Sequence, residues 1–226
     1  MKVYGLIPAY NEERNIREIV RRIKKVGVTP IVIDDASRDR TYEVAKSTKS
    51  IVLRHKSNMG KGEAIRTGLK FLRGRKFDYV VLIDADMQYV PEEVPKLIKP
   101  LSTGQADFVA GFRNFKNVPF LRHRLGNFVW RTSFNVLFGT RFKDTNCGFV
   151  AMNRKAARII AGKLYGGYIL ENSMFIQVLE SKLRTHQVPV TVKYHRSSAV
   201  PRGIRVVAGV MFYILHQGIR HRLGIK

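Results

Sequence analysis

In the first half of the chain, short apolar runs alternate with segments of helical periodicity. The strand-like runs are residues 3–9, 30–34, 51–53 and 79–83. Because strands that alternate with helices of about ten residues form parallel sheets with right-handed crossovers, this pattern predicts an α/β fold. Asn11 is the expected N-cap of the first helix, and Gly27 marks its expected end. We therefore expect the residues up to about 112 to build one parallel sheet.

The second half of the chain is less regular. Helical patterns cover residues 119–139, 155–164 and 171–183. Strand-like patterns cover residues 149–153 and a run in which apolar and polar residues alternate, namely Val188, Val190, Val192 and Tyr194. No internal repeat, low-complexity segment or linker separates the two halves. We therefore expect one continuous domain.

Polar and acidic side chains follow three of the predicted strands. The first strand ends in Pro8-Ala9-Tyr10-Asn11-Glu12, the second in the segment Asp34-Asp35-Ala36-Ser37-Arg38-Asp39-Arg40-Thr41, and the fourth in Asp84-Ala85-Asp86-Met87-Gln88. The carboxyl ends of parallel strands meet at the edge where open α/β sheets bind ligands. The last of these segments places two carboxylates and an amide on one side of a strand, and such oxygens suit Mg²⁺ or Mn²⁺. Taken alone, an Asp-x-Asp pair is more often a polar turn.

A glycine turn precedes the third predicted helix, in the sequence Asn58-Met59-Gly60-Lys61-Gly62. Exposed helix N–H groups beside Lys61 could hold an anion. The turn matches neither of the two familiar phosphate loops. A P-loop requires Ser or Thr after its Gly-Lys, and a dinucleotide fingerprint requires glycine at the position of Ile65. The sequence therefore does not favour a kinase or a dehydrogenase.

The net charge is strongly basic, with 41 Lys and Arg against 17 Asp and Glu and a formal charge of +24. Such a charge favours polyanionic partners, namely nucleic acid, an anionic membrane or phosphorylated substrates. Neither residues 108–143 nor residues 181–226 contain an acidic side chain. Both stretches are also rich in large apolar residues. They predict basic amphipathic helices at a membrane interface, although two ordinary core helices would have the same pattern.

The number of cysteines and the length of the apolar runs indicate the cellular compartment of the protein. Cys147 is the single cysteine, so no intrachain disulfide can form. The N-terminus lacks a secretory apolar region, and the longest apolar run, residues 206–215, is shorter than the roughly 20 residues that span a bilayer. We therefore expect a cytoplasmic protein whose membrane contact is peripheral.

The four strand-end and turn motifs occur in the order found in inverting family 2 glycosyltransferases, which this chain resembles over roughly residues 3–195. Within that family it is similar to the dolichyl-phosphate mannose synthase and dolichyl-phosphate glucosyltransferase branch. Further matches are Gly111-Phe112-Arg113, the segment Asp144-Thr145-Asn146-Cys147-Gly148-Phe149, and Glu171. Val150 departs from the pattern, because Arg or Lys is common there in this branch. One acceptor contact is therefore in doubt.

The resemblance implies a glycosyltransferase type A fold, with a Rossmann-like, mostly parallel sheet. We expect a catalytic domain at residues 1–200, divided into a nucleotide-sugar half (1–112) and an acceptor half (113–200). The basic and apolar pattern at 201–226 predicts a basic amphipathic, membrane-proximal helix after it. The resemblance also implies Mg²⁺ or Mn²⁺ as cofactor, held by Asp86 and Gln88. The residues implied for the nucleotide sugar are Pro8, Tyr10, Glu12, Asp35, Lys61 and Asp84.

For the acceptor, the resemblance implies the phosphate of a dolichyl or polyprenyl lipid. This oxygen is anionic at neutral pH and needs no strong general base. Candidate cations to hold it are Arg113, Arg122, Arg124 and Arg131. Asp86, Arg113 and Asp144 are the expected catalytic residues, with Asp144 organising the acceptor site. If the acceptor is instead a hydroxyl, Asp144 is the candidate base.

The sequence is compatible with several donors, acceptors and partners. The branch favours GDP-mannose as donor, with UDP-glucose or another UDP-sugar as the second choice. A family 2 enzyme acting on a glycan hydroxyl is a further possibility. Many relatives continue into transmembrane helices, so a separate membrane-anchoring subunit is a possible partner. A basic nucleic-acid-binding module is the remote alternative, because it explains the charge but not the carboxylates at successive strand ends.

Overall fold

The computed structural model describes every residue except 115–120, 163, 165–166, 194–203 and 225–226, and it leaves undescribed the side chains of residues 121–125, 168 and 204–207. Within the described residues, seven strands form one sheet in the order β3-β2-β1-β4-β6-β5-β7. The strands are β1 (Val3–Ala9), β2 (Thr29–Asp34), β3 (Ile51–Arg54), β4 (Tyr79–Leu82), β5 (Phe108–Arg113), β6 (Val150–Asn153) and β7 (Thr185–Val190). Only β6 runs antiparallel to its neighbours. The predicted α/β fold is confirmed.

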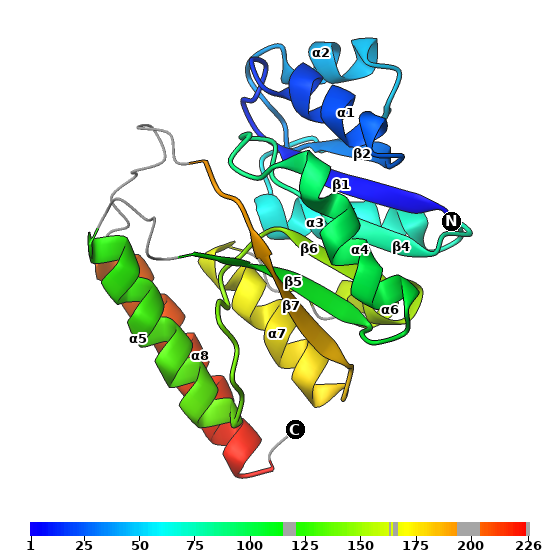
Figure 1. Cartoon of the computed structure of the whole chain (residues 1–226). Helices are drawn as coiled ribbons and strands as arrows, with labels where there is room; N and C mark the ends of the chain where they lie inside the picture. The colour runs from blue at the N-terminus through cyan, green and yellow to red at the C-terminus, as the bar shows by residue number, and fades with distance from the viewer. Residues whose placement is uncertain (115–120, 163, 165–166, 194–203, 225–226) are drawn as a thin grey trace.

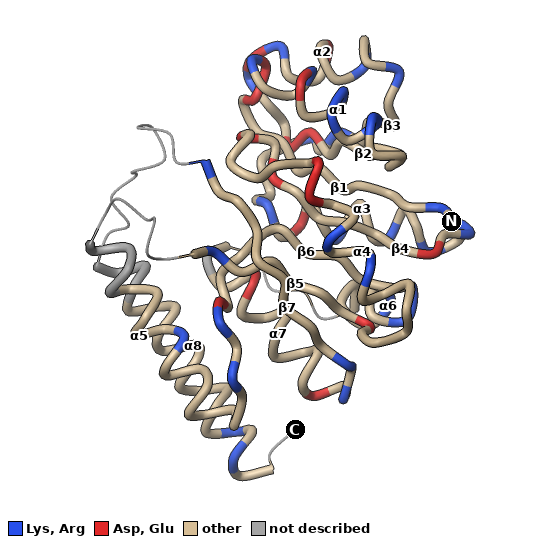
Figure 2. Tube along the Cα trace, viewed as in Figure 1, with Lys and Arg blue, Asp and Glu red and all other residues tan. Residues whose placement is uncertain are grey.

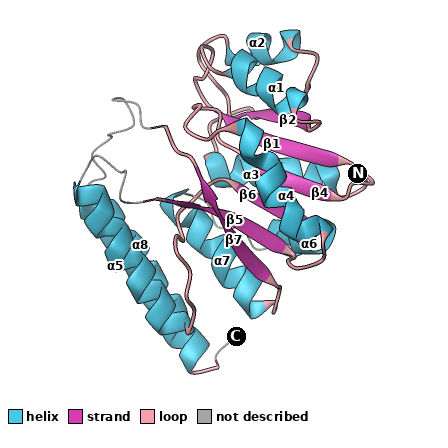
Figure 3. Ribbon diagram, in the orientation of Figure 1, coloured by secondary structure: helices cyan, strands magenta, loops and turns pink. Residues whose placement is uncertain are grey.

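Helices cover both faces of the sheet (Figures 1 and 3). One face carries α1 (Ile16–Lys25), α2 (Thr41–Ser47) and α4 (Val94–Ser102), and the other carries α3 (Lys61–Leu72), α6 (Arg154–Gly162) and α7 (Leu170–Glu180). Because successive strand residues point to opposite faces, Leu6 of β1 packs into one core and Ile7 into the other. Both are fully buried, which explains why the central strands are continuously apolar.

Two long helices, α5 (Leu121–Phe138) and α8 (Ile204–Arg222), run side by side against the sheet face that carries α7 (Figure 1). Their inner sides enter the core, with Phe134 and Ile214 fully buried. Large apolar side chains also remain exposed on the pair. This exposed apolar set consists of Phe128, Val129, Val136, Phe212, Leu215 and Ile219. No helix in the described part of the chain combines the length and apolar character needed to cross a membrane.

Two sequence expectations about local structure differ from the structure, and one helix was not predicted. Asn11 does not cap α1, which begins at Ile16; instead its backbone adopts a φ of 57° and its side chain accepts a hydrogen bond from the Arg38 N–H at 2.9 Å. The last strand begins earlier than predicted and runs over Thr185–Val190, because it pairs along the whole of β5. Val188 and Val190 of the predicted run lie in it, Val192 forms an isolated bridge with Tyr89, and Tyr194 lies outside the described residues. The sequence pattern did not reveal α4, since Pro95 and Pro100 interrupt its helical signal.

Candidate active site

The polar segments that follow β1, β2 and β4 meet at the carboxyl edge of the sheet, because these three strands are parallel neighbours. They surround a cavity of about 270 Å³, which we call the donor cavity. All six residues implied for the nucleotide sugar line it, and Asp86 lines it as well. The predicted residues along its wall are Pro8, Tyr10, Glu12, Asp35, Lys61, Asp84 and Asp86. Gln88 is outside this lining.

Asp35 is buried, and its carboxylate holds the glycine turn in place. Its oxygens accept the backbone N–H groups of Met59 at 2.8 Å and Gly60 at 2.7 Å. His55 Nδ1 lies 2.7 Å from the same carboxylate, and the other ring nitrogen of His55 contacts the Thr67 hydroxyl at 2.9 Å. Asp35 therefore joins β2, the turn and α3 at one wall of the donor cavity. The sequence analysis missed His55, because a lone histidine after a short strand carries no motif.

Lys61 opens α3 between two carboxylates. Its Nζ lies 2.7 Å from Asp84 and 3.1 Å from Glu171 of α7. Burial alone would lower the pKa of Lys61, but the two adjacent carboxylates outweigh it and raise this pKa above its ordinary value. The ammonium group is therefore charged at neutral pH and lies between two acidic side chains. Their ion pairs tie the two halves of the chain together at the cavity.

Acidic side chains cluster beyond the C-terminal end of β4. The pKa of the Glu12 carboxyl is raised by its burial and by the nearby charges of Asp86, Asp39 and Asp84, although a hydrogen bond from Asn15 opposes the rise. Asp86 accepts the Gln88 backbone N–H at 3.0 Å across a tight turn. Within the described part of the chain, no three acidic, histidine or cysteine side chains are grouped to hold a metal by themselves. An acidic pocket with oxygen donors on one side suits a divalent cation that takes its other ligands from a bound molecule.

At the end of β5, Arg113 and Asp144 form a buried bidentate pair. The Arg113 Nε donates to one oxygen of Asp144 at 2.7 Å, and Nη2 donates to the other at 3.0 Å. Arg113 Nη2 also lies 3.3 Å from Asn127 Oδ1 on α5. The Asp144 carboxylate in addition accepts the Asn146 backbone N–H at 2.9 Å. Both oxygens of Asp144 are thus engaged, and the pair is held between β5 and the first long helix.

The other predicted acceptor residues belong to α5. The guanidinium carbon of Arg131 lies 5.6 Å from the centre of the Phe128 ring. Arg131 is partly exposed and Phe128 is exposed. Arg122 and Arg124 lie outside the described side chains, so their place at the acceptor site stays a prediction. Tyr89, which the sequence analysis did not single out, is buried, and its hydroxyl accepts the Gly148 N–H at 3.0 Å. It therefore supports the loop that carries Asp144.

Gly148 offers a test of how tightly the cavity is built. A Cβ at this position would lie 2.9 Å from both the Asp84 carboxylate and Lys61 Nζ. We expect Gly148→Ala to displace these two side chains and to reduce turnover about tenfold or more, with a smaller effect on the melting temperature. The control is Gly74→Ala, whose Cβ meets nothing within 4 Å. Equal turnover in both variants, measured at saturating donor, would show that the ion-paired group is not part of the site.

Comparison with known proteins agrees with this geometry. Residues 6–160 match the model of glycosyl transferase family 2. A UDP-N-acetylglucosamine–dolichyl-phosphate N-acetylglucosaminyltransferase of Methanococcus voltae is 30% identical over 94% of this chain and 94% of its own length. A dolichol-phosphate mannosyltransferase of Pyrococcus furiosus is 34% identical over 69% of this chain, which spans 47% of that protein.

Solved structures give the same fold. Glucosyl-3-phosphoglycerate synthase from Mycobacterium tuberculosis, solved with Mn²⁺, UDP-glucose and phosphoglyceric acid, superposes with a TM-score of 0.76 at 24% identity. The match covers 100% of this chain and 80% of that one. At this identity the likeness concerns the fold alone, which is the type A glycosyltransferase fold expected from the sequence. The family model and the M. voltae relative carry the assignment further: this chain belongs to glycosyl transferase family 2 and is a glycosyltransferase.

Proposed function

We propose that the protein transfers a hexose, with inversion, from a nucleotide sugar to the phosphate of a dolichyl or polyprenyl lipid. The observation that carries the proposal is the donor cavity, where seven residues chosen from sequence alone line one space at the carboxyl edge of the sheet. The names of the M. voltae and P. furiosus relatives, both transferases to a dolichyl phosphate, support this acceptor class.

Mg²⁺ or Mn²⁺ is the cofactor of this proposal. Asp86 and Gln88 would hold it, and the acidic environment of Glu12, Asp84 and Asp86 fits a divalent cation. When bound, such an ion stabilises the charge that develops on a diphosphate leaving group. The cavity residues hold the nucleotide sugar and keep its diphosphate beside Asp86. The Mn²⁺ in the structure of glucosyl-3-phosphoglycerate synthase supports this choice.

The Arg113–Asp144 pair favours a phosphate acceptor over a hydroxyl. A hydroxyl needs a base to take its proton, and the Asp144 carboxylate already accepts hydrogen bonds at both oxygens. A lipid phosphate needs a cation instead, and Arg113 is oriented by Asp144 for that role. The nucleic-acid alternative explains the basic charge but leaves the donor cavity without a purpose. In this proposal, Asp144 positions the guanidinium of Arg113, and further arginines of α5 complete the acceptor site.

Two classes of nucleotide sugar are candidates for the donor. GDP-mannose is our first candidate, on the resemblance to dolichyl-phosphate mannose synthases. A UDP-sugar is the second, and it is supported by the donor named for the M. voltae relative, which this chain covers almost completely. The test incubates the protein and Mn²⁺ with labelled GDP-mannose, UDP-glucose and UDP-N-acetylglucosamine in turn, each with a polyprenyl phosphate. We expect one donor to give an organic-soluble labelled lipid. Failure with every donor would refute the assigned acceptor class.

The acceptor lipid places the enzyme at a membrane, and the α5–α8 pair supplies a surface for docking on its cytoplasmic side. The exposed apolar set lies on these helices together with basic residues such as Arg131, Arg220 and Arg222. Figure 2 shows Lys and Arg positions in blue along the described part of this pair and no acidic position there. Apolar side chains flanked by cations are typical of segments that lie in the headgroup region of anionic bilayers.

Docking can be measured by co-sedimentation with anionic phosphatidylglycerol vesicles. We expect Phe212→Ser/Leu215→Ser to lower the partition coefficient about tenfold, because two exposed apolar side chains are lost. A control, Lys25→Ala/Lys99→Ala, removes two charges from the opposite face and should bind almost as the parent does. If only the control weakens binding, the attraction is general electrostatics and α8 is not the docking surface.

A further inference from the structure

A second cavity, larger than the donor cavity, lies between α3 and α6 on the sheet face opposite α1. Its volume is about 660 Å³, within the range of small-molecule sites. It shares no lining residue with the donor cavity. Its lining on α3 runs from Arg66 to Arg73, which corresponds to about 8 Å to 18 Å along the helix from Lys61. The cavity is therefore separate from the active site, and we call it the α3–α6 groove.

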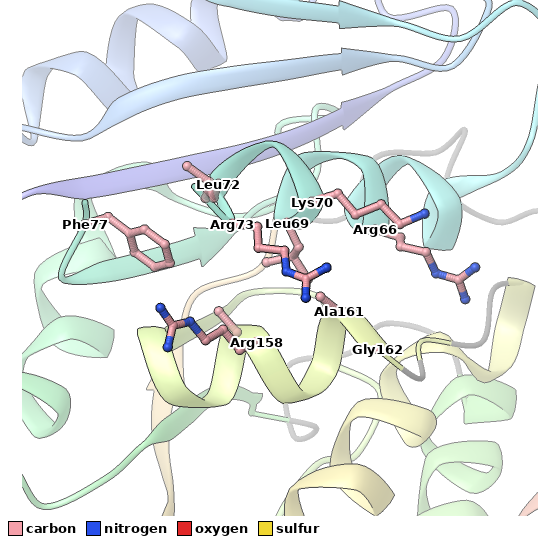
Figure 4. A pocket seen from close by; sticks show the side chains of 10 residues that line it. Arg66, Leu69, Lys70, Leu72, Arg73, Phe77, Arg158, Ala161 and Gly162 are labelled. Carbon is pink, nitrogen blue, oxygen red and sulfur yellow. The ribbon is translucent and has the colours of Figure 1, made fainter. Parts of the chain in front are cut away.

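The rim of this groove is cationic. Arg66, Lys70 and Arg73 come from α3 and its C-cap, and Arg158 comes from α6; Figure 4 shows Arg73 reaching from α3 toward the facing helix. None of the described residues that line the groove is acidic. Glu63 pairs with Arg66 at 2.9 Å, but in the described part of the chain no carboxylate forms an ion pair with the other three. An excess of about three positive charges thus faces one concave space.

Two further details point to a bound molecule. Arg66 bridges to the Leu164 carbonyl, yet its Nε is buried without a hydrogen-bond partner. A buried N–H group lowers the stability of the fold unless it donates a hydrogen bond to an acceptor. The floor of the groove is apolar, with Leu69, Phe77 and Ala161 among its residues. A ligand that fits must therefore combine an anionic group with an apolar or carbon-rich portion.

We propose that the α3–α6 groove binds a phosphate ester. The guanidinium fork matches a phosphate bidentately, and arginines from two facing helices can hold one phosphate from both sides. The apolar floor accommodates the organic part of the ester. The ester is either a soluble phosphorylated metabolite or the headgroup of a single anionic lipid, since both present the same phosphate. This inference does not rest on the proposed reaction, because no residue of the groove belongs to the donor cavity.

The test uses protein whose alanine methyl groups carry ¹³C, observed by NMR without divalent metal. Ala157 and Ala161 report on the groove, whereas Ala9 and Ala85 report on the donor cavity. Glycerol 3-phosphate and monomeric dihexanoylphosphatidic acid are titrated separately. We expect saturable shifts of the groove methyl groups with at least one of them. Tighter binding of the lipid identifies a lipid headgroup, and equal binding identifies a soluble ester.

The charge requirement is tested with Arg73→Ala/Arg158→Ala, two exposed residues whose loss should leave the fold intact. We expect the Kd to rise about tenfold or more. The control, Lys25→Ala/Lys99→Ala, removes the same charge from the opposite face and should leave the Kd unchanged. Absence of groove shifts with both ligands, or an equal loss of affinity in the control, would overturn the proposal. Either result would leave the glycosyl transfer assay unaffected.

Discussion

Asp86→Asn is expected to lower turnover about a hundredfold or more, because it removes the charged ligand proposed for the metal. The fold should survive the change. Asp86 lines the donor cavity and is not in the core, and its hydrogen bond from the Gln88 backbone N–H can be kept by the asparagine carbonyl. Turnover is measured as labelled lipid formed per minute at saturating Mn²⁺ and donor, and the fold is checked by circular dichroism and thermal unfolding.

The matched control for this variant is Asp78→Asn, which makes the same chemical change on the surface, where the Asp78 carboxylate accepts the backbone N–H of Lys2 and has no other described hydrogen bond. We expect the control to keep parental turnover. Mn²⁺ affinity, followed by electron paramagnetic resonance in the presence of the donor's nucleoside diphosphate, should fall only for Asp86→Asn. Full activity in the Asp86 variant would rule out the proposed metal site.

Asp144→Ala is expected to lower both stability and activity. It leaves the Arg113 guanidinium without its charged partner in a nearly closed environment, since the side chain of Arg113 is 16% exposed and that of Asp144 is 1% exposed. Removing one member of a buried pair costs about 3–5 kcal/mol. The free energy of unfolding, obtained from urea titrations, should therefore drop by this order. Turnover should also fall, because Arg113 loses the orientation that the carboxylate gives it.

A second variant separates these two effects. Arg113→Met/Asp144→Leu replaces the pair by apolar side chains of similar size, which should recover much of the stability but none of the activity. Glu18→Ala is the control for ion-pair loss as such, because its partner Arg21 is exposed and such pairs contribute little. If the double variant recovers activity together with stability, the pair serves the fold and does not position the acceptor.

Much of the sheet could be predicted, because its signals are local. The runs at β1, β2 and β4 are apolar and end in turn-forming polar residues, so each strand and its end can be recognised without reference to the rest of the chain. The carboxyl edge then follows from parallel pairing alone. This is why Tyr10, Glu12 and the Asp-x-Asp segment come together in the structure as expected.

Other features depend on long-range pairing and were not predictable in this way. The antiparallel insertion of β6 pairs it with β4, about 70 residues earlier, and with β5, about 40 residues earlier, and no local pattern specifies it. His55 and Tyr89 act by holding Asp35 and the Gly148 loop, and such supporting contacts have no sequence signature. The α3–α6 groove could not be predicted either, since its cations come from two helices that are distant in sequence.

The proposed acceptor, a lipid phosphate, can be tested with two lipids that differ only in carrying a phosphate or a hydroxyl at the end of the same chain. A polyprenyl phosphate and the corresponding polyprenol are each incubated with the active donor and Mn²⁺, and the labelled lipid is quantified after organic extraction. We predict product from the phosphate and none above background from the alcohol, because the Asp144 carboxylate is occupied by Arg113 and cannot serve as base. Comparable product from the alcohol would contradict the account.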